Sequence, residues 1–189
     1  MSKQVQVGGV AVGGGASVKI QSMTTTQTSD IEATAEQISR LYEAGCEIVR
    51  VAVRGEEDAR AIGKLKEHSP LPIVADIHFS AKLAILATEN GADKIRINPG
   101  NIGGQAQIKA VADCIRAHGI PVRVGSNTGS IEKEFFEKYG RTAPALVESA
   151  LHNVQLLEKF GVRDIVISVK ASSVPLTVEA YRILAKKTD

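Results

Sequence analysis

One pattern repeats six times along the sequence: a short run rich in β-branched residues is followed by a segment with the periodicity of an α-helix. Strands that alternate with helices form a parallel sheet, because each helix carries the chain back to the edge where the preceding strand began. This repeat restricts the chain to a small number of α/β folds. The predicted strands are residues 18–23, 48–53, 73–77, 94–98, 122–126 and 165–170.

Local signals mark where the predicted helices begin and end. Asp30 is a suitable N-cap for the first helix, and Pro144 and Pro175 fit the first turn of the last two. A glycine ends each of four helical runs shortly before the next strand, where a left-handed conformation is often required. These glycines are Gly45, Gly91, Gly119 and Gly161.

The sequence contains no linker, charge block or low-complexity segment that would divide it. Residues 4–15 are rich in glycine and predict a small hairpin ahead of the first repeat. We therefore expect residues 1–17 to be a hairpin or lead-in and residues 18–189 to be one domain. Residues 131–138 form a charged insertion after the fifth strand, which we expect to be partly helical and either to cover a pocket or to be a solvated loop.

Two architectures accept six such units: an open, doubly wound sheet and a (β/α)8 barrel. The central strands of an open parallel sheet are usually apolar on both faces. Here nearly every predicted strand carries polar residues at alternate positions, and these positions share one face of the strand. We therefore predict a (β/α)8 TIM-barrel type of fold. Because a complete barrel takes ~250 residues, only six of its eight units fit into this sequence.

The polar face of the predicted strands carries an excess of positive charge. Four strands each contribute one cation, whereas Asp76 is the single acid on this face. Unpaired charges in a confined interior are costly, and arginine matches the geometry of phosphate, so the pattern predicts a phosphate or diphosphate site at the C-terminal end of the barrel. A salt-bridged barrel interior is the alternative. The four cations are Arg50, Arg96, Arg123 and Lys170.

Further polar residues share this face or follow its strands. Asn98, Asn127 and Ser168 have the parity of the cations. Asp76 and His78 stand together at the end of the third strand, where they either perform acid–base chemistry or form a structural hydrogen-bonded pair. The glycine-rich segment 99–104 follows the fourth strand and is either a backbone cradle for phosphate or a plain tight turn.

Composition excludes several classes of protein. The chain has 189 residues, 23 Lys and Arg against 21 Asp and Glu, and only three Tyr, four Phe and no Trp, so we expect no binding of nucleic acid. No apolar run is long enough to span a membrane, and the polar N-terminus does not resemble a secretory signal. Cys46 and Cys114 are too few for a disulfide scaffold or a metal site and fit a reducing, cytoplasmic location.

Two other functions remain open at this point. Burial among arginines would depress the pKa of Lys170 and would make it suitable for Schiff-base chemistry in a phosphate-binding aldolase. The chain is otherwise a non-catalytic module that binds an anion, or that self-associates through the open edges of an incomplete barrel.

Six segments in order resemble one known family. They read QSMT (21–24), IVRV (48–51), VADIHF (74–79), RINPGNIG (96–103), RVGSN (123–127) and SVKAS (168–172). From about Val5 onward the chain resembles the N-terminal barrel of the 4-hydroxy-3-methylbut-2-enyl diphosphate synthases of non-mevalonate isoprenoid (terpenoid) biosynthesis.

The resemblance implies an iron–sulfur oxidoreductase that reductively opens 2-C-methyl-D-erythritol 2,4-cyclodiphosphate. It implies that a [4Fe–4S] cluster lies in a separate C-terminal domain, that ferredoxin or flavodoxin donates the electrons, and that bacterial members are homodimers. It assigns Asp76 and His78 to the catalytic face with less defined roles. It assigns the substrate to Arg50, Arg96, Asn98, Arg123, Asn127, Ser168 and Lys170.

The chain departs from the family pattern at two places. Ser126, Thr128 and Ile131 replace some of the residues usual after the fifth strand. The seventh and eighth strands of the barrel and the cluster-binding cysteines do not occur in the sequence, so we expect the chain alone to bind the cyclic diphosphate incompletely and to lack activity.

Overall fold

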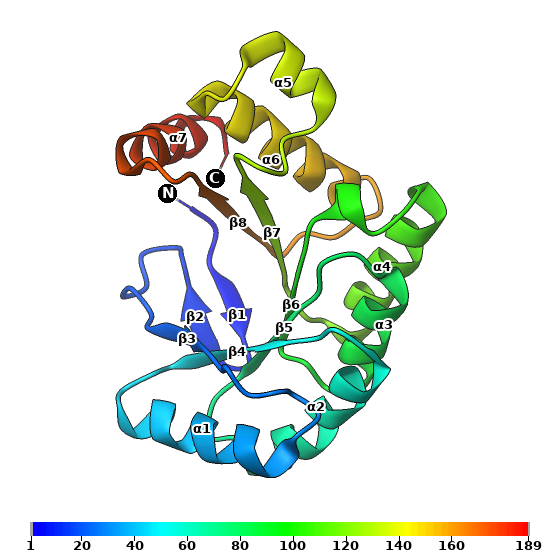
Figure 1. The fold of residues 1–189 in the computed structure, drawn as a ribbon. Coiled ribbons are helices and arrows are strands. Elements are labelled where there is room, and N and C mark those ends of the chain that lie inside the picture. Colours follow the sequence, from blue (N-terminus) through cyan, green and yellow to red (C-terminus); the bar gives the residue numbers. More distant parts are fainter. Residues whose placement is uncertain (1, 189) are drawn as a thin grey trace.

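The computed structural model describes residues 2–188. Its centre is a six-stranded parallel sheet with the order β3-β4-β5-β6-β7-β8, which curves into a half-barrel (Figure 1). The prediction of a TIM-barrel type of fold with six units is confirmed. The strands are β3 (Gln21–Met23), β4 (Ile48–Ala52), β5 (Ile73–Asp76), β6 (Lys94–Ile97), β7 (Val122–Asn127) and β8 (Ile165–Lys170).

Helices connect the successive strands and lie on the outer face of the half-barrel (Figure 1). Asp30 caps the first helix by accepting a hydrogen bond from the Ala33 amide at 3.1 Å, as predicted. The helices are α1 (Ile31–Glu43), α2 (Glu56–His68), α3 (Ala81–Glu89), α4 (Gln105–His118), α5 (Lys133–Tyr139), α6 (Ala143–Glu158) and α7 (Val174–Lys187), and a 3-10 turn, η1 (Pro99–Asn101), follows β6. The four predicted glycines that follow helices have φ angles of +88° (Gly45), +89° (Gly91), +63° (Gly119) and +81° (Gly161).

One parity of the strands packs against the helices and forms the main hydrophobic core. Val49, Val51, Ile73 and Ile95 are fully shielded from solvent in this layer. Side chains of the other parity face the inside of the half-barrel. The sheet therefore separates an apolar outer layer from a polar inner face, as the alternation of the sequence predicts.

An antiparallel hairpin, β1 (Val5–Val7) with β2 (Val10–Val12), lies at the N-terminal ends of the strands. Val7 is completely buried against Ile48 and Val74, near the starts of β4 and β5. On the opposite side of the half-barrel, Lys3 pairs with Asp164, just before β8, at 2.7 Å between Nζ and Oδ1. The N-terminal segment thus crosses the base of the half-barrel, and we refer to β1 and β2 as the base hairpin.

The first predicted strand is wrong at its start. Residues 18–20 lie outside β3, and Val18 and Ile20 are 95% and 60% exposed. The segment is instead tied to Glu47, whose carboxylate accepts hydrogen bonds from the Lys19 amine and the Ile20 amide, each at 2.9 Å. Among residues 2–188, β3 pairs with β4 alone and therefore has a neighbouring strand on one side only. Without a second neighbour, the β-branched residues at 18 and 20 do not extend the strand.

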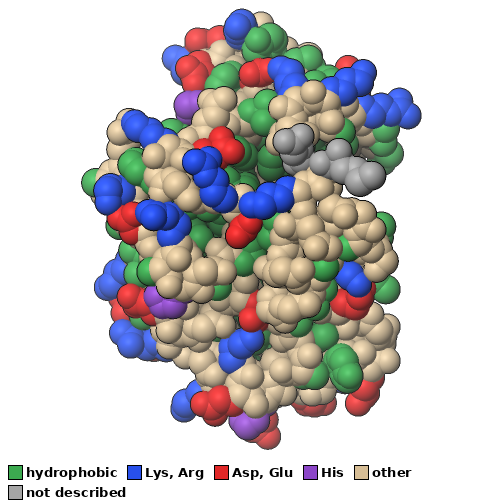
Figure 2. Space-filling view, turned by 180° about the vertical axis from the view of Figure 1, so that it is seen from behind, with side chains coloured by type: hydrophobic (Ala, Val, Ile, Leu, Met, Phe, Trp, Pro, Cys, Tyr) green, Lys and Arg blue, Asp and Glu red, His purple; other side chains and the backbone are tan. Residues whose placement is uncertain are grey.

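Charged side chains of both signs are interspersed on the face of the molecule opposite to the view of Figure 1 (Figure 2). None of the helices formed by residues 2–188 combines the length and the apolar character needed to cross a membrane.

Candidate anion-binding site

The register of the strands arranges the inner face in rows that run across the sheet. We call the row nearer the base the lower row and the next row toward the C-terminal ends of the strands the upper row. The lower row consists of Met23, Arg50, Val74 and Lys94. The upper row consists of Ala52, Asp76, Arg96, Arg123 and Val166.

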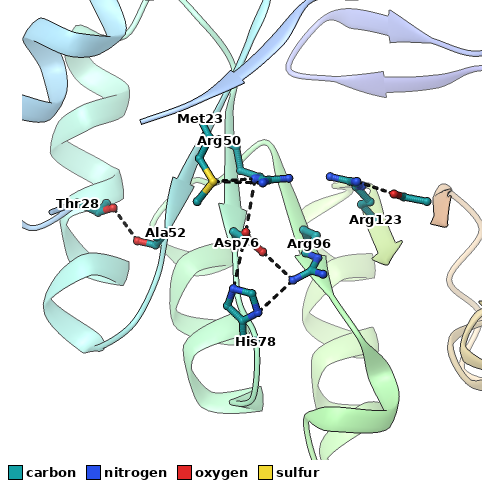
Figure 3. Close-up of polar contacts among 9 residues, drawn as sticks. Met23, Thr28, Arg50, Ala52, Asp76, His78, Arg96 and Arg123 are labelled. Atoms are coloured by element: carbon teal, nitrogen blue, oxygen red, sulfur yellow. Dashed lines mark hydrogen bonds and ion pairs between the residues drawn. The ribbon is translucent and has the colours of Figure 1, made fainter. Parts of the chain in front are cut away.

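Asp76 lies at the centre of these rows and contacts three basic side chains (Figure 3). Its Oδ1 is 3.1 Å from Arg96 Nη1, and its Oδ2 is 3.5 Å from Arg50 Nε and 3.8 Å from His78 Nε2. Arg96 Nη1 also donates to His78 Nδ1 at 3.2 Å. With an exposed fraction of only 4%, the Asp76 carboxylate acts as a buried anchor that orients both arginines.

Met23 holds the Arg50 guanidinium from the other side. Arg50 Nε and Nη2 each donate to the Met23 thioether sulfur at 3.2 Å (Figure 3). The thioether is a weak acceptor that carries no charge, so it fixes the guanidinium without neutralising it.

Arg123 has no carboxylate partner among the described residues. Its Nη2 donates to the Ser168 hydroxyl at 2.6 Å, which positions the guanidinium. Burial, followed by the positive charges of Arg50 and Arg96, lowers the pKa of Arg123 from its ordinary value. Three arginines thus share the inner face with one carboxylate, and this excess of positive charge is the property of a site for an anion.

Lys94 is a cation that the sequence analysis missed. It lies in the lower row beside Val74, and only 3% of it is exposed. Burial, followed by the charges of Arg123 and Arg50, lowers its pKa from 10.5 to about 8. The signal was present in the sequence, because Lys94 has the same parity as Arg96.

Two asparagines lie above these rows, at the C-terminal ends of the strands. Asn98 follows β6 and accepts from the Gly100 amide at 3.2 Å, and Asn127 ends β7 and accepts from the Gly129 amide at 2.9 Å. Both side-chain oxygens are engaged in local turns, so the amide NH₂ groups are the donors that these side chains offer to a ligand. Both residues, with His78 and Arg96, line a hollow of about 350 Å³.

A larger hollow, about 1030 Å³, lies beside β8, the base hairpin and α7. Its lining includes Val5, Ile167, Tyr181 and Leu184. Arg50, Arg96 and Arg123 do not line it, so we place the candidate site at the inner face next to the smaller hollow, which Arg96 and the two asparagines line.

Lys170 stands at the outermost position of the site. It pairs in register with Asn127 at the C-terminal end of β8 and is exposed. Burial of Lys170 among the arginines, the premise of the aldolase alternative, does not occur, because β8 carries this residue beyond the two rows. Its position suits contact with the outer part of a bound anion, and the aldolase alternative loses the burial on which it depended.

The glycine-rich segment after β6 is a tight turn and not an open cradle. The Gly100 amide donates to Asn98 Oδ1 at 3.2 Å and to Asn153 Oδ1 at 2.8 Å, so this N–H is already satisfied. The side chain of Asn153, which is fully buried in α6, also donates to Glu132 Oε1 at 2.6 Å. Asn153 thereby ties the turn and the insertion that contains α5 to the same helix.

Within residues 2–188, no three His, Cys, Asp or Glu side chains are grouped so that they could hold a metal ion. Cys46 is buried and donates its thiol to the Ile48 carbonyl at 3.1 Å. Cys114 is half-buried on α4, where burial raises the pKa of its thiol. The described residues therefore do not fit an iron–sulfur cluster.

Comparison with known sequences shows that the chain matches a single protein family over almost its whole length. Residues 2–189 match the family described as the GcpE TIM-barrel domain. The 4-hydroxy-3-methylbut-2-en-1-yl diphosphate synthase (flavodoxin) of Caldanaerobacter subterraneus subsp. tengcongensis is 53% identical over 190 residues, which cover 100% of this chain and 54% of the relative. The protein of the same name from Helicobacter hepaticus is 57% identical over 188 residues, with 100% and 53% covered. The chain thus spans about half the length of the curated relatives it matches.

Solved structures with low sequence identity share the fold. A truncated 3-deoxy-D-arabino-heptulosonate 7-phosphate synthase from Thermotoga maritima aligns with a TM-score of 0.68 at 16% identity, over 98% of this chain and 65% of that one. The dihydropteroate synthase of Yersinia pestis aligns with a TM-score of 0.64 at 11% identity, over 97% and 70%. These similarities support the barrel architecture alone.

Proposed function

The chain belongs to the GcpE TIM-barrel family, and from this premise we propose that its inner face binds the cyclic diphosphate substrate of a 4-hydroxy-3-methylbut-2-en-1-yl diphosphate synthase. That substrate is 2-C-methyl-D-erythritol 2,4-cyclodiphosphate, and the complete enzyme opens its ring reductively. The observation that carries the proposal is the imbalance of charge: Arg50, Lys94, Arg96 and Arg123 share two adjacent rows with Asp76 as the single acid. A diphosphate supplies the missing negative charge and accepts the directional hydrogen bonds of arginine.

The geometry supports distinct roles for the site residues. Arg50 and Arg96, held by Asp76, bind phosphate oxygens, and Arg123 does so from the position set by Ser168. The outer phosphate and the carbon skeleton are contacted by the remaining ligands, Asn98, Asn127 and Lys170.

Asp76 and His78 have different tasks in this proposal. Both oxygens of the buried Asp76 carboxylate already face basic side chains, so Asp76 is a positioning residue. The His78 side chain is 54% exposed and lines the smaller hollow, where it can donate a hydrogen bond or a proton to a bound oxygen.

The reductive half of the reaction needs groups outside the described residues. We propose that a [4Fe–4S] cluster in a C-terminal domain supplies the electrons, that a flavodoxin or ferredoxin reduces it, and that the enzyme acts as a homodimer in the cytoplasm. The names of the relatives specify flavodoxin. The role of residues 18–189 is then to hold the substrate, with residues 1–17 closing the base of the barrel.

Calorimetric titration of the chain with the cyclic diphosphate and with inorganic pyrophosphate tests this proposal. We expect both ligands to bind, and Arg123→Gln to weaken binding about tenfold or more, since a bidentate charged contact is lost. Arg163→Gln is a matched control because Arg163 is exposed and lies near the base, so it should bind as the unmodified chain does. Equal affinity of Arg123→Gln and the unmodified chain would exclude the inner face as the anion site.

A further inference from the structure

Lys94 is the most deeply buried cation of the inner face. It lies in the lower row, beside Val74 and two strands from Arg50, with 3% of its surface exposed. The base hairpin closes this region from below, because Val7 packs on Val74. Lys94 is therefore beneath the arginines of the upper row, on the side away from the hollow.

The protein around Lys94 does not neutralise its charge. The Asp76 carboxylate is paired with Arg50, Arg96 and His78, and no carboxylate in the described chain forms an ion pair with Lys94 or Arg123. The charged or titratable groups that face this region are Arg50 on β4, Asp76 and His78 at β5, Arg96 on β6, Arg123 on β7 and Tyr181 on α7.

Packing alone does not account for a lysine at this position. A positive charge on a residue that is only 3% exposed and lies next to other cations opposes folding, and an unbranched apolar side chain of similar length fills the same space without that cost. Methionine is such a side chain, because it is flexible and lacks charge. We therefore look for the reason for this charge in the ligand that the inner face binds.

We propose that Lys94 is an electrostatic support of the diphosphate site: from beneath the arginines, its charge strengthens the binding of a diphosphate that it does not touch. This inference rests on the proposed function, and it adds a residue to which no role has been assigned. An anion bound above the upper row attracts Lys94 as well as the arginines and so offsets the repulsion among these cations, and the low dielectric of a buried site extends this effect over several ångströms.

Binding is then coupled to the protonation of Lys94. Its pKa of about 8 in the free protein lies below its ordinary value. A bound anion favours the charged form and raises this pKa, so at about pH 8 binding takes up a proton. The affinity for an anion should consequently fall as the pH rises past the pKa of the free protein, because binding then has to include protonation of the neutral amine.

The test compares Lys94→Met with Lys64→Met, which removes the same charge from an exposed position on α2. Titration with inorganic pyrophosphate at pH 7 should show about tenfold weaker binding for Lys94→Met and an unchanged affinity for Lys64→Met. The melting temperature of Lys94→Met should equal or exceed that of the unmodified chain. Affinity within twofold of the unmodified chain, or a lowered melting temperature, overturns the proposal, and the second result assigns Lys94 a structural role.

A second measurement needs no substitution. Sulfate does not titrate in the alkaline range, so its affinity for the unmodified chain should fall from about pH 7 to about pH 9.5, whereas Lys94→Met should give a flat profile. A flat profile for the unmodified chain overturns the role of Lys94. The result is separable from the proposed function, because Arg123→Gln weakens pyrophosphate binding if the site is correct, whatever the effect of Lys94→Met.

Discussion

The guanidinium of Arg96 lies directly over the backbone of Gly125. A Cβ atom added to Gly125 would stand 3.0 Å from Arg96 Nε and 3.1 Å from Nη2, so the guanidinium would have to shift by a few tenths of an ångström. Gly125 follows Arg123 on the inner face of β7, so the absence of a side chain there makes the space into which Arg96 extends. The smaller hollow is lined by both residues.

The first prediction follows from this contact. Gly125→Ala should displace the Arg96 side chain and weaken the binding of pyrophosphate about three- to tenfold, because Arg96 is then misaligned with the phosphate. Calorimetric titration measures the effect. Gly55→Ala is the control, since a Cβ at Gly55 meets nothing within 4 Å. Unchanged affinity of Gly125→Ala would show that Arg96 does not bind the anion.

The second prediction concerns the buried carboxylate. Asp76→Asn keeps the shape of the side chain but leaves Arg50 and Arg96 without their counter-charge, so the free energy of unfolding should fall by about 2–4 kcal/mol at pH 7. Urea denaturation measures this loss. Asp113→Asn removes a carboxylate from exposed ion pairs with Lys109 and Arg116 and should change stability by less than about 1 kcal/mol. Equal effects of the two substitutions would contradict the anchoring role of Asp76.

The third prediction concerns Asn153, which joins the turn after β6 to the insertion after β7. Asn153→Ala removes the shorter of the two hydrogen bonds of the Gly100 amide and the partner of the Glu132 Oε1 atom, so the free energy of unfolding should fall by about 2–4 kcal/mol. Gln155→Ala, at an exposed position of the same helix, should have little effect. Denaturation curves of the two variants decide the matter, and coincident curves would show that this hydrogen-bonded junction contributes nothing to stability.

The fourth prediction concerns the edges of the sheet. Within residues 2–188, β3 and β8 each have a neighbour on one side only, so the N–H and C=O groups on their other sides are available for pairing. We expect the 189-residue chain to self-associate as its concentration rises. Light scattering over a range of concentrations measures the mass. A stable monomer at every concentration would show that side chains or the base hairpin protect these edges.

The sequence predicts the architecture well because its signals are local and repeated. The glycines at 45, 91, 119 and 161 adopt the positive φ angles that their positions imply. The alternation of Arg50, Arg96 and Arg123 with apolar residues predicts which side chains pack against the helices and which face the inside of the half-barrel. The predicted start of β3 is wrong because the length of a strand depends on its pairing with neighbouring strands, and a local run of residues does not reveal these neighbours.

The site is predicted in part. Parity identifies which side chains share the inner face, but the depth of a residue in the barrel depends on the register between strands. Register puts Lys94 in the buried lower row and leaves Lys170 at the exposed rim, although both are lysines with the parity of the site. The Gly100 amide donates a hydrogen bond to Asn153, which lies 53 positions away in the sequence. No motif around Gly100 predicts that partner.

The base hairpin has a consequence for the order in which the protein assembles. Its segment contacts β4 and β5 through Val7 and reaches the start of β8 through Lys3, whose partner Asp164 is 161 positions distant in the chain. This N-terminal segment can therefore complete its contacts only after β8 has been synthesised. Closing the long loop between Lys3 and Asp164 is slow. We therefore expect the base of the half-barrel to form late in folding, after the local βα units have packed.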